Sequence, residues 1–158
     1  MRNVTASLAS LALMIAGGLA GCGDGGPRAA LDVARLPFVA GAQVTAQARQ
    51  CDRGANAFCA LQFVAVDPRY HSSGDFIVAE RRYLRSLGWS LVNGEANGER
   101  AAESPGHKLR LTYSSATSDL QQVELGLIQR ARPIEVALSQ ALFRGAPAMS
   151  LMLEDSSS

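Results

Sequence analysis

The amino-acid sequence predicts an α+β domain, a two-layer sandwich in which an antiparallel sheet built from two hairpins packs on helices. Two strand-like runs flank the polar spacer of CDRGANAFC, residues 51–59, and predict the first hairpin. Apolar residues recur at helical spacing over 76–87, and KLRLTY, residues 108–113, alternates between apolar and polar side chains. The expected order of hairpin, helix, hairpin, helices and a last strand is that of a two-layer α+β domain.

The N-terminal segment, residues 1–21, has the three parts of a secretory signal. Arg2 is its only charged residue, an apolar run fills 4–20, and small residues precede Cys22. An uncleaved transmembrane anchor is one alternative, but 4–20 is shorter than the roughly 20 apolar residues that a span needs. Plain secretion is a second alternative, in which a cysteine would directly follow the cleavage point.

The residues Leu19-Ala20-Gly21-Cys22 resemble the lipobox of bacterial lipoproteins. This resemblance implies that the signal 1–21 is removed and that a diacylglyceryl group, with palmitate-like chains, is attached to Cys22. The protein would then be lipid-anchored in the cell membrane or outer membrane, facing the extracytoplasmic side. Each buried methylene contributes about 0.8 kcal/mol, so two or three acyl chains would hold the protein firmly.

The same glycine-rich stretch fits the letters of the dinucleotide-binding fingerprint, as Gly21-x-Gly23-x-x-Gly26. That fingerprint needs a buried strand before its first glycine and a helix after its last, so that the pyrophosphate meets a helix N-terminus. No buried strand precedes Gly21 here. We therefore expect no cofactor, and we interpret 22–36 as a flexible tether that precedes a single α+β domain at 37–155.

The charge composition narrows the choice of partners. The chain has 15 basic and 14 acidic residues, and removal of Arg2 with the signal would make the two numbers equal. A neutral domain argues against nucleic acid as a partner and against electrostatic attachment to anionic lipid. The hydrophobic fraction of 47% is ordinary for a globular domain.

The cysteines Cys51 and Cys59 are expected to form a structural disulfide. Lipidation of Cys22 would leave these two as a pair, and Gly54 and Asn56 between them are turn residues. Facing residues of an antiparallel pair lie close enough for a disulfide. A metal site and a redox pair are the alternatives, but no histidine lies nearby and the spacing is not C-x-x-C.

The predicted hairpin raises a question of faces. If Cys51 faces Cys59, Arg49 faces Leu61, and a polar run shares a face of the sheet with an apolar run. A β-bulge near the loop would shift one strand and remove this conflict.

The most regular helical pattern follows this hairpin. Ser72 and Ser73 are candidate N-caps, Asp75 lies in the favourable first turn, and Gly88 ends the helix. Its apolar stripe is expected to face the core. A cluster of arginines lies on the other face and is typical of a solvated surface, with an anion site as the alternative; these are Arg81, Arg82 and Arg85.

The C-terminal half contains two further strand patterns. WSLV, residues 89–92, is expected to pair with 108–113 across a long polar loop. Residues 118–130 fit a helix that begins with a capping box at Ser118 and Gln121, and they also fit a strand. A further helix is expected from Pro133 to about residue 143, and a last strand at 149–153.

No catalytic or metal-binding motif is present. His71 and His107, the only histidines, lie in polar loops outside any spaced metal motif, so no metal ligand and no catalytic residue is assigned. Two hypotheses of function remain. The first is a non-catalytic domain that binds an envelope protein, a cell-wall component or a small ligand. The alternative is a small exported hydrolase that uses loop residues, because catalytic triads are geometric rather than sequential.

Overall fold

The computed structural model describes residues 36–51, 59–92 and 100–155 of the chain. The predicted signal 1–21, the lipid-attachment residue Cys22 and all but the last residue of the predicted tether lie outside these ranges. Leu36, that last tether residue, is buried in the core of the domain.

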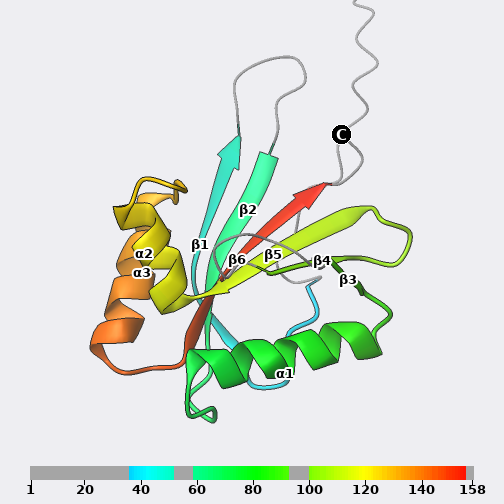
Figure 1. Cartoon of the computed structure of the whole chain (residues 1–158), viewed down its shortest axis with the longest axis horizontal. Coiled ribbons are helices and arrows are strands. Elements are labelled where there is room, and N and C mark those ends of the chain that lie inside the picture. The colour runs from blue at the N-terminus through cyan, green and yellow to red at the C-terminus, as the bar shows by residue number, and fades with distance from the viewer. Residues whose placement is uncertain (1–35, 52–58, 93–99, 156–158) are drawn as a thin grey trace, which may run out of the picture. The chain divides into compact units, whose positions relative to one another are not determined.

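A six-stranded antiparallel sheet forms the centre of the domain, in the order β1-β2-β6-β5-β4-β3 (Figure 1). The strand that comes last in the sequence lies in the middle of the sheet, where it pairs with β2 on one side and β5 on the other. This final strand was expected at 149–153, but its central place was not. The strands are β1 (Gln43–Cys51), β2 (Cys59–Val66), β3 (Ser90–Val92), β4 (Arg100–Glu103), β5 (Leu109–Ser115) and β6 (Ala148–Asp155).

Three helices accompany the sheet in the described part of the chain, so the α+β class is confirmed. They are α1 (Ser73–Ser86), α2 (Ala116–Glu124) and α3 (Arg132–Phe143). The α1 helix begins as predicted, because the Ser72 side chain accepts a hydrogen bond of 3.1 Å from the Asp75 backbone N–H. The α2 helix begins three residues before the predicted capping box, with Ser115 as N-cap and Ser118 N–H as its donor.

The helices cover both faces of the sheet, so the predicted two-layer packing is not confirmed. One core cluster joins α1 to one face through residues such as Phe63, Leu84 and Tyr113. A second cluster joins α3 and the start of α2 to the opposite face, around Val64 and Leu138. Side chains alternate between faces along a strand, and β2 therefore supplies Phe63 to one core and Val64 to the other.

The first hairpin has the predicted register, with Cys51 opposite Cys59 and Arg49 opposite Leu61. The expected conflict of faces is real, but its bulge lies at Val44–Ala46, at the far end from the loop. The conflict is tolerated because β1 is an edge strand. Its small residues Ala46 and Ala48 pack toward α3, whereas Gln47 and Arg49 on the other face of the strand are exposed.

The second predicted pairing is wrong. Residues 90–92 pair with β4, and β4 in turn pairs with β5, so the region is a three-stranded meander and not a single hairpin. The β4 strand has the sequence RAAE within a stretch that the composition marks as loop. Four residues with two alanines carry almost no alternation signal, although Ala101 and Ala102 are fully buried.

Candidate functional site

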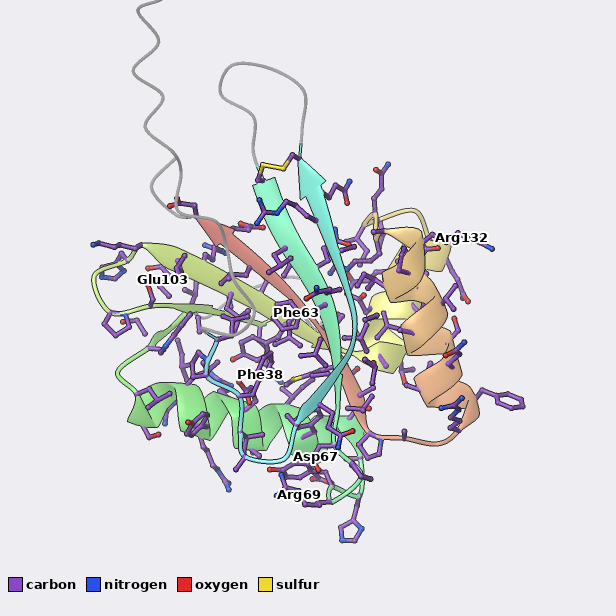
Figure 2. All side chains as sticks on the ribbon, turned by 180° about the vertical axis from the view of Figure 1, so that it is seen from behind. Phe38, Phe63, Asp67, Arg69, Glu103 and Arg132 are labelled. Carbon is purple, nitrogen blue, oxygen red and sulfur yellow. A yellow bond between two sulfur atoms is a disulfide. The ribbon has the colours of Figure 1, made fainter. Side chains whose placement is uncertain are left out.

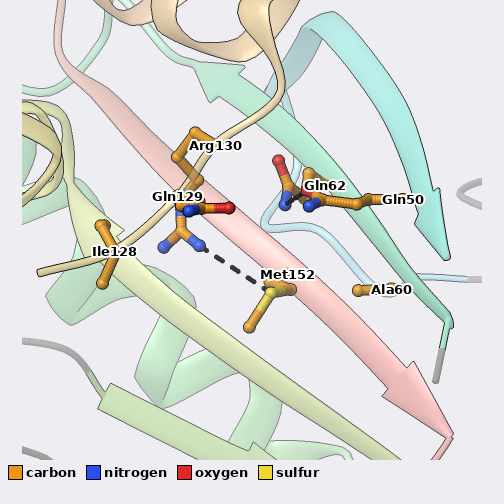
Figure 3. A pocket seen from close by; sticks show the side chains of 7 residues that line it. All are labelled: Gln50, Ala60, Gln62, Ile128, Gln129, Arg130 and Met152. Carbon is orange, nitrogen blue, oxygen red and sulfur yellow. Dashed lines mark hydrogen bonds between the residues drawn. The ribbon is translucent and has the colours of Figure 1, made fainter. Parts of the chain in front are cut away.

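A pocket of about 270 Å³ opens where the α2–α3 connection crosses the sheet (Figure 3). Its floor comes from β2 and β6, one side comes from the end of β1, and the other side comes from residues 128–130 of the connection. Amide and guanidinium groups share the lining with apolar side chains. The lining residues are Gln50, Ala60, Gln62, Ile128, Gln129, Arg130 and Met152.

A buried ion pair fixes one side of the pocket by joining the α2–α3 connection to α2. Arg130 donates from Nε to Asp119 Oδ2 at 3.0 Å and from Nη2 to Oδ1 at 2.8 Å. The Arg130 side chain is 6% exposed and that of Asp119 is fully buried. This bidentate geometry fixes the plane of the guanidinium group, and each charge compensates the other in a place that water does not reach.

The guanidinium group also reaches the central strand. Its Nη1 atom lies 3.8 Å from the thioether sulfur of Met152 on β6 (Figure 3). Sulfur is a weak acceptor, so this contact contributes little energy. The contact matters for position, because the Arg130 side chain is now held at one end by Asp119 on α2 and at the other by Met152 at the centre of the sheet.

A second buried polar residue, Gln62, ties the floor of the pocket to its sides. Its Nε2 atom donates to Gln50 Oε1 at 2.9 Å, and its Oε1 atom accepts from the Ala131 backbone N–H at 2.9 Å. Gln62 is 3% exposed, so both ends of its amide need these partners. The sequence carried a signal for it, since Gln62 is the one polar residue of the apolar strand CALQFVAV.

The predicted disulfide is present and lies directly beside the pocket. Cys51 and Cys59 are bonded, with their Cα atoms 4.1 Å apart. The next pair along the hairpin is Gln50 opposite Ala60, and both residues line the pocket. The disulfide therefore closes the end of the strand pair that forms this side of the site (Figure 2).

The two histidines do not share a site. His71 lies in the turn between β2 and α1, next to Asp67 and Arg69, which form an ion pair with each other. His107 lies in the β4–β5 turn, where its Nδ1 atom is 2.5 Å from Glu103 Oε2. These turns are at opposite ends of the sheet, separated by the length of β6, which is roughly 23 Å at about 3.3 Å per residue (Figure 2).

The surroundings of Asp67 explain its acidity without a catalytic role. Hydrogen bonds from Arg69 hold the pKa of this carboxyl group below its usual range, although burial acts in the opposite direction. Neither Asp67 nor either histidine lines the pocket. Within the described residues, no group of three histidine, cysteine, aspartate or glutamate side chains could hold a metal ion.

A further set of buried polar groups lies on the α1 face of the sheet. Glu80 is fully buried, its Oε2 atom accepts a 2.9 Å hydrogen bond from the Val39 backbone N–H, and burial raises its pKa to about 7. Tyr113 is 1% exposed, and burial raises the pKa of its hydroxyl group too. The alternation of residues 108–113 predicts that Tyr113 points inward, and its burial confirms this. Sequence patterns missed Glu80, because it replaces an apolar residue on an otherwise regular helical stripe.

The pocket suits a neutral polar ligand. Gln50 and Gln129 offer amide donors and acceptors, the ion pair has no net charge, and Ala60, Ile128 and Met152 provide apolar contact. None of the helices in the described ranges has the length and apolar character of a membrane span. No protein-family model, curated protein or solved structure matches the chain.

Proposed function

We propose that this protein is an exported, lipid-anchored protein of the cell envelope whose domain binds a small polar ligand without transforming it. The observation that carries the proposal is the pocket beside the α2–α3 connection, whose polar walls are fixed by the Asp119–Arg130 pair and the Gln62 amide. A site of this kind is pre-organised, because the residues that form it are already held before a ligand arrives.

The ligand class follows from the lining. Amide donors and acceptors next to apolar side chains match a molecule that carries amide or hydroxyl groups on a partly apolar frame. An N-acetylated sugar and a short neutral peptide of the cell wall have this chemistry. A strongly charged ligand would meet no uncompensated charge in the Asp119–Arg130 pair.

The lipid anchor is proposed from the motif that ends at Cys22. It would place the domain on the extracytoplasmic side of the cell membrane or the outer membrane, where the membrane is a partner through covalent lipid and cell-wall fragments are available. Nucleic acid is not proposed as a partner, since the mature chain would be neutral.

The alternative function, a hydrolase that uses loop residues, has less support. His71 and His107 lie at opposite ends of the sheet, and neither approaches the pocket. The described serines whose buried hydroxyl groups have no hydrogen-bond partner are Ser114 and Ser150, which face each other across β5 and β6. No histidine is among the residues that pair with them. A nucleophile and its base must lie within hydrogen-bond reach, and neither Ser114 nor Ser150 has a histidine at that distance.

The test uses two probes, N-acetylglucosamine and an acetylated dipeptide amide, with the full-length chain. We expect Gln129→Ala to weaken the binding of whichever probe binds by about fivefold, the effect of one neutral hydrogen bond. Gln47→Ala is the matched control, because Gln47 is exposed on the opposite face of the neighbouring strand. Calorimetry would measure both dissociation constants.

Two results would contradict the proposal. One is that neither probe binds and chemical shifts of the pocket residues do not change on addition of either. The other is that His71→Ala or His107→Ala, while folded as judged by its melting temperature, fails to complement a deletion strain. That second outcome would support the hydrolase instead.

A further inference from the structure

The arginines of α1 occupy two different sides of that helix. The buried stripe includes Glu80 and Leu84, and Arg81 and Arg85 each directly follow one of these residues. Because successive residues turn by about 100°, both arginines lie on the same flank of the stripe, one helical turn apart. Arg82 lies a further 100° around the helix, toward solvent.

A third arginine reaches the same region from the sheet. Arg100 on β4 is paired in register with Tyr113 on β5, so the two side chains stand beside each other on the face that α1 covers. Arg100 is exposed, whereas Tyr113 is 1% exposed. The exposed Arg100 side chain thus lies beside a buried phenol.

The Tyr113 hydroxyl group is the second observation. It is buried, and it has no hydrogen-bond partner within the described residues. The positive charges of Arg81, Arg100 and Arg85 act on this hydroxyl and lower its pKa against the larger effect of burial. Strand register places Arg100 beside Tyr113, and Arg81 and Arg85 lie on the helix that covers the same face of the sheet.

The three arginines also lack compensation. Within the described ranges, none of them forms an ion pair with a carboxylate, whereas Arg69, Arg110 and Arg130 do. Like charges at neighbouring positions on a helix destabilise it slightly. An anion placed among the three groups would remove that repulsion.

We propose that Arg81, Arg85, Arg100 and the Tyr113 hydroxyl form a binding site for a phosphate group. All four side chains can donate hydrogen bonds, and guanidinium groups match the several oxygens of a tetrahedral anion through paired N–H donors. This site is on the opposite face of the sheet from the pocket and does not depend on it. The phosphate belongs either to a free anion or to a lipid head group.

Glu80 gives the site a dependence on pH. Its charge acts on the Tyr113 hydroxyl in the opposite sense to the arginines, and its Oε1 atom is buried without a partner within the described residues. The polar groups that interact with Glu80 are the Val39 N–H and the Tyr113 hydroxyl group, while Arg81, Arg85 and Arg100 act on the same hydroxyl. The phosphodiester head group, whose single negative charge does not change in this range, should bind more tightly below a pH of about 7, where Glu80 is protonated, than above it.

The test measures binding to the full-length chain in a neutral, phosphate-free detergent at low salt. One titration uses inorganic phosphate, and a second uses glycerophosphoglycerol, the water-soluble head group of an anionic phospholipid. We expect Arg100→Gln and Arg81→Gln each to weaken binding by at least about tenfold, as the loss of a charge-assisted hydrogen bond does. Tyr113→Phe, which keeps the ring in the core, should weaken binding by about fivefold.

Arg82→Gln is the matched control, with the same change of charge on the far side of α1. Its dissociation constant should rise much less than that of Arg100→Gln, because Arg82 points away from the site and makes no hydrogen bond to the phosphate. Tight binding of phosphate alone identifies a free anion, and tight binding of the head group identifies a lipid. Failure of both to bind, or equal losses in Arg82→Gln and Arg100→Gln, would overturn the site.

Discussion

Glu80 shows how one buried carboxyl group makes the stability of the domain depend on pH. Its pKa is raised from 4.5 to about 7, chiefly because burial disfavours the charged form, while the hydrogen bond from Val39 acts in the opposite direction. Protonation therefore favours the folded state. The stability that this group contributes is fully present below a pH of about 4.5 and is lost as the pH rises through about 7.

We predict that Glu80→Gln removes this part of the pH dependence. Between about pH 5 and about pH 8, the free energy of unfolding of the wild type should fall by up to about 3 kcal/mol from this group alone. The variant, which keeps an acceptor for Val39, should lose far less over the same interval. Urea denaturation measures the difference, with Glu124→Gln as the exposed control on α2. Equal losses in Glu80→Gln and the wild type would contradict this account.

The Asp119–Arg130 pair is a second feature at the scale of residues. Asp119→Asn leaves a buried guanidinium group without its counter-charge, and we expect it to destabilise the domain by about 3 to 5 kcal/mol. The double variant Asp119→Asn with Arg130→Met removes both charges and should recover much of that loss. Chemical denaturation of the three proteins forms the test. A double variant as unstable as the single one would mean that the pair does not act through its charge.

At the scale of elements, the first hairpin carries both the disulfide and two residues that line the candidate pocket. Replacing both Cys51 and Cys59 by serine should destabilise the domain by about 2 to 3 kcal/mol, from the chain entropy of a short loop. Because Gln50 and Ala60 are the next pair along the hairpin, the same change should also weaken binding of a ligand in the pocket. Non-reducing peptide mass spectrometry checks the bond itself, and two freely alkylated thiols in exported protein would exclude it.

The elements that could be predicted are those whose signal is local. The α1 helix has a cap, a stripe and a terminating glycine within its own residues, and the first hairpin has two cysteines at matching ends. The β4 strand was missed because its pairing depends on β3 and β5 and not on its own four residues. The start of α2 was misplaced because Ser115 and Ser118 are equally good caps by sequence, and the strand before it decides.

The candidate pocket was beyond sequence reasoning for a related reason. Its lining comes from β1, β2, β6 and the α2–α3 connection, which are distant in the chain and meet through sheet order. Gln62 was visible as a polar residue in an apolar strand, but its partners Gln50 and Ala131 were not. The two histidines are the residues of the chain best suited to acid–base chemistry, but both lie in turns and neither lines the pocket.

At the scale of the whole molecule, the proposed attachment through Cys22 would determine where the domain acts. Cys22→Ser should move the protein from the membrane fraction to the soluble exported fraction, because the acyl chains would be its only hold on the bilayer. Labelling with a palmitate analogue should mark the wild type and not the variant. Persistent labelling of Cys22→Ser would exclude this residue as the site of attachment.

The central place of β6 has a consequence for how the domain is made. Within the described residues, the pair β1-β2 and the meander β3-β4-β5 are joined in the sheet through β6, which follows all five of them in the sequence. Until residues 148–155 emerge, each half presents an open edge, and the non-local pairing that unites them is the slow kind. We therefore expect that β1-β2 and β3-β4-β5 cannot join into one sheet in a chain that is cut before Ala148.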